Sequence, residues 1–138
     1  MGPGALVSVY KSLVRPCFNY ACVVYHSMLS ESLSEQLGKQ QRKILKIIRG
    51  WDISYRQALA STGLERLDVR RSSLRERFVL KLAANERFAD WLPVNETPAY
   101  SLREYNKYVE LPFKTERLRR APLYYFRRVL NFLESEKN

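Results

Sequence analysis

The segment from Ser30 to Gly50 limits the possible folds more than any other part of the sequence. Apolar residues recur in it at intervals of three and four, which is typical of an amphipathic helix. These residues are Leu33, Leu37, Ile44, Leu45, Ile47 and Ile48. Ser32 and Glu35 have the spacing of a capping box, and Gly50 lies where a helix commonly ends in a left-handed turn. A stable chain has to cover the apolar side of this helix, so the segment predicts a packed helical domain.

The same spacing predicts a helix before this segment, over residues 5–28. Pro16 lies inside it and cannot donate a backbone hydrogen bond, so we expect a kink at that point. A break of the helix after Arg15 is the alternative.

Helix signals also follow Gly50. Ser54 and Gln57 predict the start of a short helix that Gly63 ends. Asp68 is predicted to cap a longer helix that runs to about Leu92.

The last third of the chain has a different character. Residues 93–113 contain three prolines and few aliphatic residues, which predicts an extended connection. Residues 114–120 form a basic turn or short helix in this prediction, and Pro122 suits the first turn of a last helix. The expected fold class is therefore all-α, a bundle of about four to five helices over residues 1–92. Residues 93–138 add the extended segment and a C-terminal helix that packs back on the bundle.

Few residues are suited to catalysis or to cofactor binding. The sequence has no glycine-rich phosphate-binding loop and no GxSxG motif, and its one histidine, His26, has only Glu31 as a nearby carboxylate. Cys17, Cys22 and His26 lack the paired C-x2-C spacing that is usual in zinc sites, so packing is favoured over metal binding. We therefore expect no enzyme activity, no metal, no cofactor and no small-molecule substrate.

Cysteine content and hydropathy bear on the compartment. Two cysteines are too few for a secreted disulfide framework. The sequence also lacks an apolar stretch of about 18 residues that would span a membrane. We expect a cytoplasmic or nuclear protein with reduced thiols.

Charge gives the clearest indication of a partner. The chain has 24 Lys and Arg residues against 14 Asp and Glu, a formal net charge of +10, which favours a polyanionic partner. Residues 38–50 contain five cations and no carboxylate, and the helical spacing places these cations opposite the apolar side. They are Lys39, Arg42, Lys43, Lys46 and Arg49. An ordinary solvated helix face commonly mixes both signs, so a face of one sign favours contact with nucleic acid.

Two further groups of cations extend this prediction. The first comprises Arg70, Arg71 and Arg75. The second comprises Lys114, Arg117, Arg119 and Arg120, next to Phe113, Tyr124 and Tyr125. Cations beside aromatic rings are suited to holding phosphates and stacking bases, although the same rings are equally suited to a core. Sixteen of the 24 cations are arginine, which binds phosphate with two parallel hydrogen bonds.

Several runs of residues together resemble one known family. Residues 9–16 read VYKSLVRP and residues 20–25 read YACVVY, and the helical segment Leu33–Ile48 contains Gln41-Arg42-Lys43. Residues 54–71 and 108–117 add further partial matches. In this order the runs resemble the segment that follows the catalytic palm in LINE-type (non-LTR) retrotransposon reverse transcriptases. The present sequence has Tyr25 where that family usually has Trp.

This resemblance implies a helical thumb or connector that grips a template–primer duplex. The catalytic aspartates of that family lie upstream, in a palm domain, and no [FY]-x-D-D motif occurs here. The resemblance therefore implies a non-catalytic module that binds RNA, DNA or a hybrid duplex, mostly through phosphates.

Two alternatives stay open. The chain is suited to being a helical protein–protein interaction module that docks on a missing palm domain or another protein, with an apolar patch around Val23. A surface helix that binds anionic membranes ranks last, because the core needs the apolar side of the Ser30–Gly50 helix. No membrane partner is therefore predicted.

Overall fold

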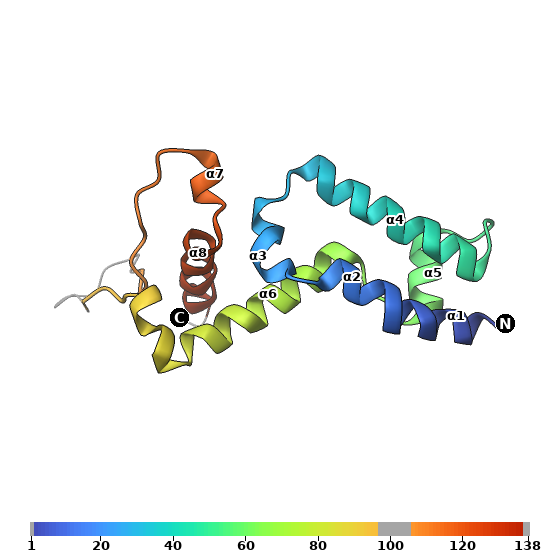
Figure 1. The fold of residues 1–138 in the computed structure, drawn as a ribbon, viewed down its shortest axis with the longest axis horizontal. Helices are drawn as coiled ribbons and strands as arrows, with labels where there is room; N and C mark the ends of the chain where they lie inside the picture. Colours follow the sequence, from blue (N-terminus) through green and yellow to red (C-terminus); the bar gives the residue numbers. More distant parts are fainter. Residues whose placement is uncertain (1, 97–105, 137–138) are drawn as a thin grey trace. The chain divides into compact units, whose positions relative to one another are not determined.

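The computed structural model describes residues 2–96 and 106–136, and the regular elements among these residues are helices (Figure 1). The all-α prediction is confirmed. The α-helices are α1 (Pro3–Val9), α2 (Arg15–Asn19), α3 (Cys22–Tyr25), α4 (Glu31–Arg49), α5 (Tyr55–Thr62), α6 (Leu67–Ala83), α7 (Glu116–Arg119) and α8 (Pro122–Ser135). A π-helical turn, η1 (Tyr10–Val14), and two 3₁₀ helices, η2 (His26–Met28) and η3 (Glu86–Trp91), complete them.

These residues form two compact units. Unit 1 comprises Met1–Cys22 and Leu29–Ser73, and unit 2 comprises Val23–Met28 and Leu74–Asn138. The dividing point therefore lies inside α6, between Ser73 and Leu74. The sequence instead predicts a boundary at residue 92. The physical reason is that the second half of α6 contributes to the same core as α8.

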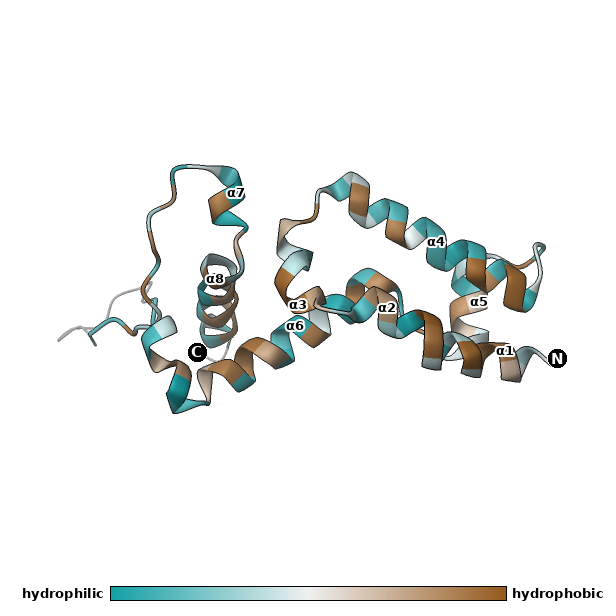
Figure 2. Cartoon of the chain, in the orientation of Figure 1, coloured by the Kyte–Doolittle hydropathy of each residue, from teal (hydrophilic) through white to brown (hydrophobic). Residues whose placement is uncertain are grey.

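Each unit has its own apolar core. In unit 1 the buried core residues are Tyr10, Leu45, Ile48, Ala58 and Leu64. In unit 2 they are Val79, Leu82, Leu92, Tyr108, Phe126 and Leu130. Figure 2 shows hydrophilic residues over most of the visible side of α4 and apolar residues on α1, which contacts α4. The apolar side of α4 is thus only partly covered within unit 1: Leu45 and Ile48 are buried, whereas Leu33 and Ile47 are 49% and 69% exposed.

The N-terminal helical segment is more broken than the sequence predicts. A π-helical turn precedes α2, and in it the Arg15 amide donates to the Tyr10 carbonyl. Pro16 supplies no donor, and a wider turn directly before it is a common response to that loss. The helix ends at Asn19, and Ala21 has a φ of 48°. The prediction of a single helix over residues 5–28 is wrong, and the break lies at Tyr20 and Ala21, not after Arg15. The described residues form eight α-helices, several of them short.

The first turn of α4 starts two residues earlier than predicted. The hydroxyl of Ser30, not that of Ser32, caps the helix by accepting a hydrogen bond from the Leu33 amide at 3.3 Å. The helix ends at Gly50 as predicted, and its φ of 104° is one that other residues rarely adopt. With a ψ of 165°, however, Gly50 does not have the left-handed helical conformation that the sequence predicts.

The signals for α5 are confirmed in detail. Ser54 and Gln57 form a reciprocal capping box, and Gly63 closes the helix in the left-handed conformation with a φ of 61°. The prediction for the next helix is less accurate, because Asp68 lies within the first turn of α6 and this helix ends at Ala83. A separate 3₁₀ helix, capped by Asn85, occupies the residues up to Trp91.

Two polar side chains of α8 hold the connecting segment within unit 2. The Asn131 side chain accepts a hydrogen bond from the Tyr108 amide at 2.8 Å and donates one to its carbonyl at 3.0 Å. Arg127 donates to the carbonyls of Trp91 at 2.8 Å and of Val109 at 3.3 Å. Val94 and Tyr108 also form an isolated antiparallel bridge. The predicted extended connection is therefore anchored at both ends, and its central part, residues 97–105, lies outside the described residues.

Candidate nucleic-acid interface

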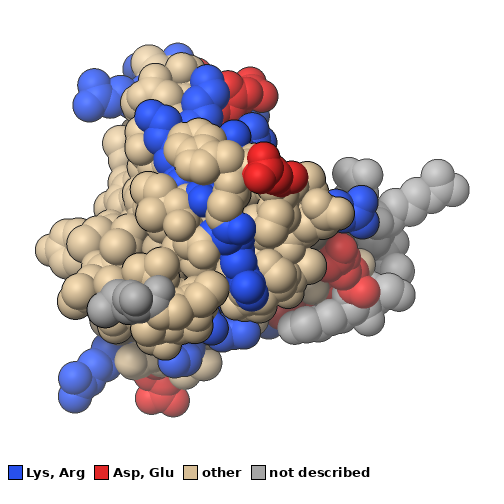
Figure 3. All heavy atoms as spheres, turned by 90° about the vertical axis from the view of Figure 1, so that its right-hand side faces the viewer, with Lys and Arg blue, Asp and Glu red and all other residues tan. Residues whose placement is uncertain are grey.

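The five cations predicted on the middle helix all lie on α4, and we call them the α4 basic face: Lys39, Arg42, Lys43, Lys46 and Arg49. The first four are exposed and Arg49 is partly buried. Within residues 2–96 and 106–136, none of the five forms an ion pair with a carboxylate. Figure 3 shows the face of the molecule that carries the end of α4, where Lys and Arg side chains form a band with few acidic side chains beside it. Carboxylates of the described residues thus do not neutralise the charge of this face.

Aromatic rings support two of these cations. The Arg42 guanidinium lies 4.9 Å from the centroid of the Tyr55 ring, and the Lys46 ammonium lies 5.0 Å from that of Trp51. A cation over an aromatic ring gains electrostatic attraction and keeps its charge. Trp51 is 70% exposed, so its ring is also accessible to a partner. The result is a basic helix with rings at its edge, a combination suited to phosphates and bases.

Arg49 has a different environment from the other four. Its guanidinium donates a hydrogen bond to the Ser61 carbonyl near the end of α5. This bond ties the ends of the two helices together and restricts the side chain. Arg49 therefore adds positive charge to the face but has a structural contact of its own.

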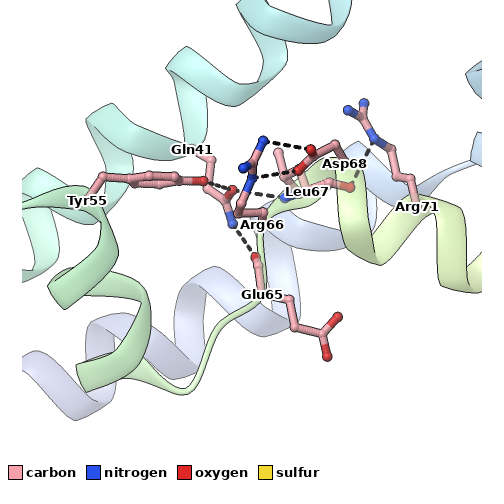
Figure 4. Close-up of polar contacts among 7 residues, drawn as sticks. All are labelled: Gln41, Tyr55, Glu65, Arg66, Leu67, Asp68 and Arg71. Carbon is pink, nitrogen blue, oxygen red and sulfur yellow. Dashed lines mark hydrogen bonds and ion pairs between the residues drawn. The ribbon is translucent and has the colours of Figure 1, made fainter.

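A buried polar residue fixes α4 against the segment that leads into α6. Gln41 is 1% exposed, and its side-chain amide donates to the Glu65 carbonyl at 2.8 Å. Its oxygen accepts from the Tyr55 hydroxyl at 2.7 Å and from the Leu67 amide at 3.1 Å (Figure 4). The position of the basic face on unit 1 therefore depends on Gln41.

The protonation of Tyr55 supports this network. Burial raises the pKa of Tyr55 above its ordinary value, and the nearby Arg42 guanidinium offsets only part of the rise. The hydroxyl consequently remains protonated at neutral pH and can donate to Gln41.

An ion pair between Arg66 and Asp68 lies next to the hydrogen-bond network of Gln41. Arg66 donates two hydrogen bonds to Asp68, at 3.1 Å and 2.8 Å. Partial burial acts to raise the pKa of Asp68, but these hydrogen bonds and those from backbone amides outweigh it and lower the pKa. Asp68 is therefore ionised at neutral pH and neutralises Arg66.

The three arginines of α6 do not form one exposed surface. Arg70 is partly exposed, whereas Arg71 is 0% exposed and donates from Nε to the Leu67 carbonyl at 3.2 Å. Arg75 is buried in unit 2, with its guanidinium 4.2 Å from the centroid of the Tyr125 ring. Arg71 and Arg75 are thus inside the protein, and only Arg70 of this group is available to extend a surface.

The C-terminal cations belong to unit 2 and are partly neutralised. Arg119 and Arg120 both pair with Glu116, at 2.8 Å and 2.9 Å, and Arg119 also lies 5.9 Å from the centroid of the Phe113 ring. Hydrogen bonds from the two arginines lower the pKa of Glu116, which keeps it ionised. Lys114 and Arg117 are exposed. This group carries less uncompensated charge than the α4 basic face.

The residues considered for metal binding do not assemble into a site. Cys17 is exposed and donates to the Leu13 carbonyl at 3.3 Å, while Cys22 is buried. The described ranges contain no group of three or more His, Cys, Asp or Glu residues with metal-binding geometry. Across the same ranges, no helix combines the length and the apolar character needed to cross a membrane.

Sequence patterns did not indicate two contributors to this interface. Trp51 lies two residues after Arg49, the last cation of α4. An aromatic residue so close to a basic helix is the signal that could have indicated its place beside the basic face. Gln41 has no such signal, because a glutamine among Lys and Arg residues is usually solvated.

Comparison of the chain with models of known protein families, with curated proteins and with solved structures finds no match. The resemblance to the post-palm segment of LINE-type reverse transcriptases therefore remains a prediction from the sequence.

Proposed function

We propose that this protein is a non-catalytic module that binds nucleic acid through the phosphate backbone, with the α4 basic face as its main contact. The observation that carries this proposal is a face of one charge sign on a single helix. Its exposed cations have no carboxylate partner among the described residues, and aromatic rings support two of them. Such a face attracts phosphates of any sequence, because phosphate contacts carry no base information.

The favoured ligand is a duplex of RNA, DNA or both. Cations one helical turn apart, such as Lys39, Lys43 and Lys46, suit the regular spacing of phosphates along a duplex strand. The resemblance to a thumb that grips a template–primer duplex favours the same ligand. Lys114 and Arg117 provide a weaker second surface on unit 2.

Salt dependence tests the proposal most directly. We expect the affinity for a short duplex to fall about 150-fold between 50 mM and 200 mM salt, with a log–log slope of about −3.6, if four exposed cations each neutralise one phosphate. Fluorescence of Trp51 measures the binding, in a background with Trp91→Phe so that Trp51 is the one tryptophan left. A second duplex of unrelated sequence should give the same slope. Absence of binding at 50 mM salt, or a flat response to salt, would contradict the proposal.

Charge reversal tests which face makes the contact. The double variant Lys43→Glu and Lys46→Glu should lower the affinity for both duplexes about 30-fold at 50 mM salt and reduce the slope by about two. Fluorescence anisotropy of a labelled duplex measures both quantities.

A matched control has the same change of net charge on another surface. Arg77 and Lys81 are exposed on the part of α6 that belongs to unit 2. Reversing both should change the affinity less than threefold, since the net charge alone acts weakly at this salt concentration. Equal losses in the two double variants would show that the α4 basic face is not the specific contact.

A protein partner is the second candidate function. Val9, Leu13 and Tyr20 are apolar or aromatic residues of unit 1 that are 38%, 67% and 81% exposed. Side chains of this kind are frequent at protein interfaces. If the duplex does not bind at low salt, docking of another protein on these residues becomes the favoured function.

A further inference from the structure

A polar pocket lies between the first half of α4 and the start of α6. Its volume is about 380 Å³, and all of its lining residues belong to unit 1. The lining residues that matter here are Glu35, Lys39, Arg42, Arg66, Asp68 and Arg71. Figure 4 shows Arg71 beside Asp68, with its guanidinium directed away from the α6 backbone. Lys43, Lys46 and Arg49 do not line the pocket, so it is distinct from most of the α4 basic face.

Arg71 is the exceptional group of this pocket. Its side chain is 0% exposed, and its Nε–H donates to the Leu67 carbonyl. Both terminal nitrogens are buried and have no hydrogen-bond partner among the described residues. Burying a guanidinium with two of its three nitrogens unpaired and no ion pair is strongly unfavourable, because one hydrogen bond does not replace the hydration that the group loses. The site therefore calls for an anion with several acceptor oxygens.

The charges around the pocket do not already supply that anion. Asp68 is bound by Arg66 through both of its oxygens. Glu31 and Glu35 also line the pocket, but both are exposed and neither forms an ion pair within the described part of the chain. The pocket lining contains four cations and three carboxylates and therefore has a formal charge of +1. Arg71 is the charged residue of this lining that is fully buried.

We propose that this pocket binds a single phosphate group, with Arg71 as the buried counter-charge and with Lys39 and Arg42 at the pocket mouth. The planar fork of a guanidinium matches two phosphate oxygens in a bidentate pair of hydrogen bonds. The exposed ammonium of Lys39 and guanidinium of Arg42 are placed to neutralise the remaining phosphate charge. The source is either inorganic phosphate or the terminal phosphate of a nucleotide chain, and the two share this chemistry. The phosphate site does not depend on duplex binding by Lys43 and Lys46.

Thermal unfolding in phosphate against chloride, at equal ionic strength, tests the site. At a phosphate concentration ten times Kd, the Tm of the full chain should rise by about 5 °C above its value in chloride. The variant Arg71→Met removes the buried charge at similar volume, and its rise should shrink to the general stabilising effect of phosphate. Lys81→Met removes one exposed charge that lies outside both the pocket and the α4 basic face, and it should behave as the unchanged chain does. Equal rises in the unchanged chain and in Arg71→Met would overturn the proposal.

A second variant keeps the test valid if Arg71→Met does not fold. Glu35→Gln alters an exposed residue of the pocket lining, removes a like charge from the phosphate and should tighten binding about threefold, as followed by ³¹P NMR titration. Absence of ³¹P line broadening in both the unchanged chain and Glu35→Gln would contradict the site directly.

Oligonucleotides with and without a 5′-phosphate identify the source. A terminal phosphate that binds in the pocket should raise oligonucleotide affinity about tenfold, and Arg71→Met should abolish that gain. If both oligonucleotides bind with equal affinity while the Tm still rises in inorganic phosphate, the ligand of the pocket is free phosphate. The Lys43→Glu, Lys46→Glu variant should retain its Tm rise in phosphate, so the two proposals fail separately.

Discussion

Replacing Gln41 by leucine is expected to lower the free energy of unfolding of unit 1 by about 3 kcal/mol, because one buried and two partly buried polar groups lose their partner. The side chain of Gln41 is the partner of the Tyr55 hydroxyl, the Glu65 carbonyl and the Leu67 amide. Leucine fills a similar volume and cannot make any of these hydrogen bonds. Denaturant unfolding measures the loss, and hydrogen exchange at the Leu67 amide should report faster local opening.

The adjacent residue provides the control for this change. Gln40 lies on the same helix and is exposed, so Gln40→Leu should change the stability by less than about 0.5 kcal/mol. Tyr55→Phe removes only one of the three hydrogen bonds and should have an intermediate cost of about 1 kcal/mol. If Gln41→Leu and Gln40→Leu had equal effects, Gln41 would not be the residue that fixes α4.

Replacing Asn131 by leucine should destabilise unit 2 by about 2–3 kcal/mol. This side chain satisfies both the amide and the carbonyl of Tyr108, and Tyr108 is itself a buried core residue. Loss of both bonds leaves the Tyr108 backbone without partners next to the core and weakens the attachment of the connecting segment to α8. Denaturant unfolding gives the size of the effect, and hydrogen exchange at the Tyr108 amide gives its location.

Asn106→Leu is a suitable comparison for this second change. The Asn106 side chain is exposed in the same connecting segment, and its amide donates a long hydrogen bond to Glu110, at 3.5 Å. We expect a change below about 0.5 kcal/mol. A similar loss in both variants would mean that the segment is held by general packing, with no special role for Asn131.

Short-range rules accounted for the parts of the fold that are controlled by neighbouring residues. The capping box of Ser54 and Gln57 and the glycine ends at Gly50 and Gly63 follow the sequence directly. Each of these features depends on a few consecutive residues, so the sequence alone determines it. The start of α4 was placed two residues late because Ser30 and Ser32 are both good caps, and only the packed structure selects between them.

Interactions between distant residues could not be read in the same way. Helical spacing places polar residues outside, yet Gln41, Arg71, Arg127 and Asn131 are buried. Three of them bond to backbone groups that lie 18 to 36 residues away along the chain. Such bonds depend on which segments pack together, and the spacing of apolar residues along the sequence does not show which segments these are.

The same distinction explains why only part of the candidate site could be predicted. Membership of the α4 basic face requires only helical periodicity, and its five cations do lie on one helix. The extension through Arg70, Arg71 and Arg75 assumed that cations point to solvent. That assumption does not hold at Arg71 and Arg75, whose side chains are buried, although Arg77 and Lys81 on the same helix are exposed.

The division of the chain into units limits how the protein can be dissected. Residues 23–28 belong to unit 2, although unit 1 residues precede and follow them, and η2 within this segment packs against α8. No single cleavage of the chain can therefore release either unit intact. A fragment that stops at Ser73 would keep η2 but lose α8, which η2 contacts in the full chain. Limited proteolysis inside α6 should consequently lead to loss of both units instead of a stable half.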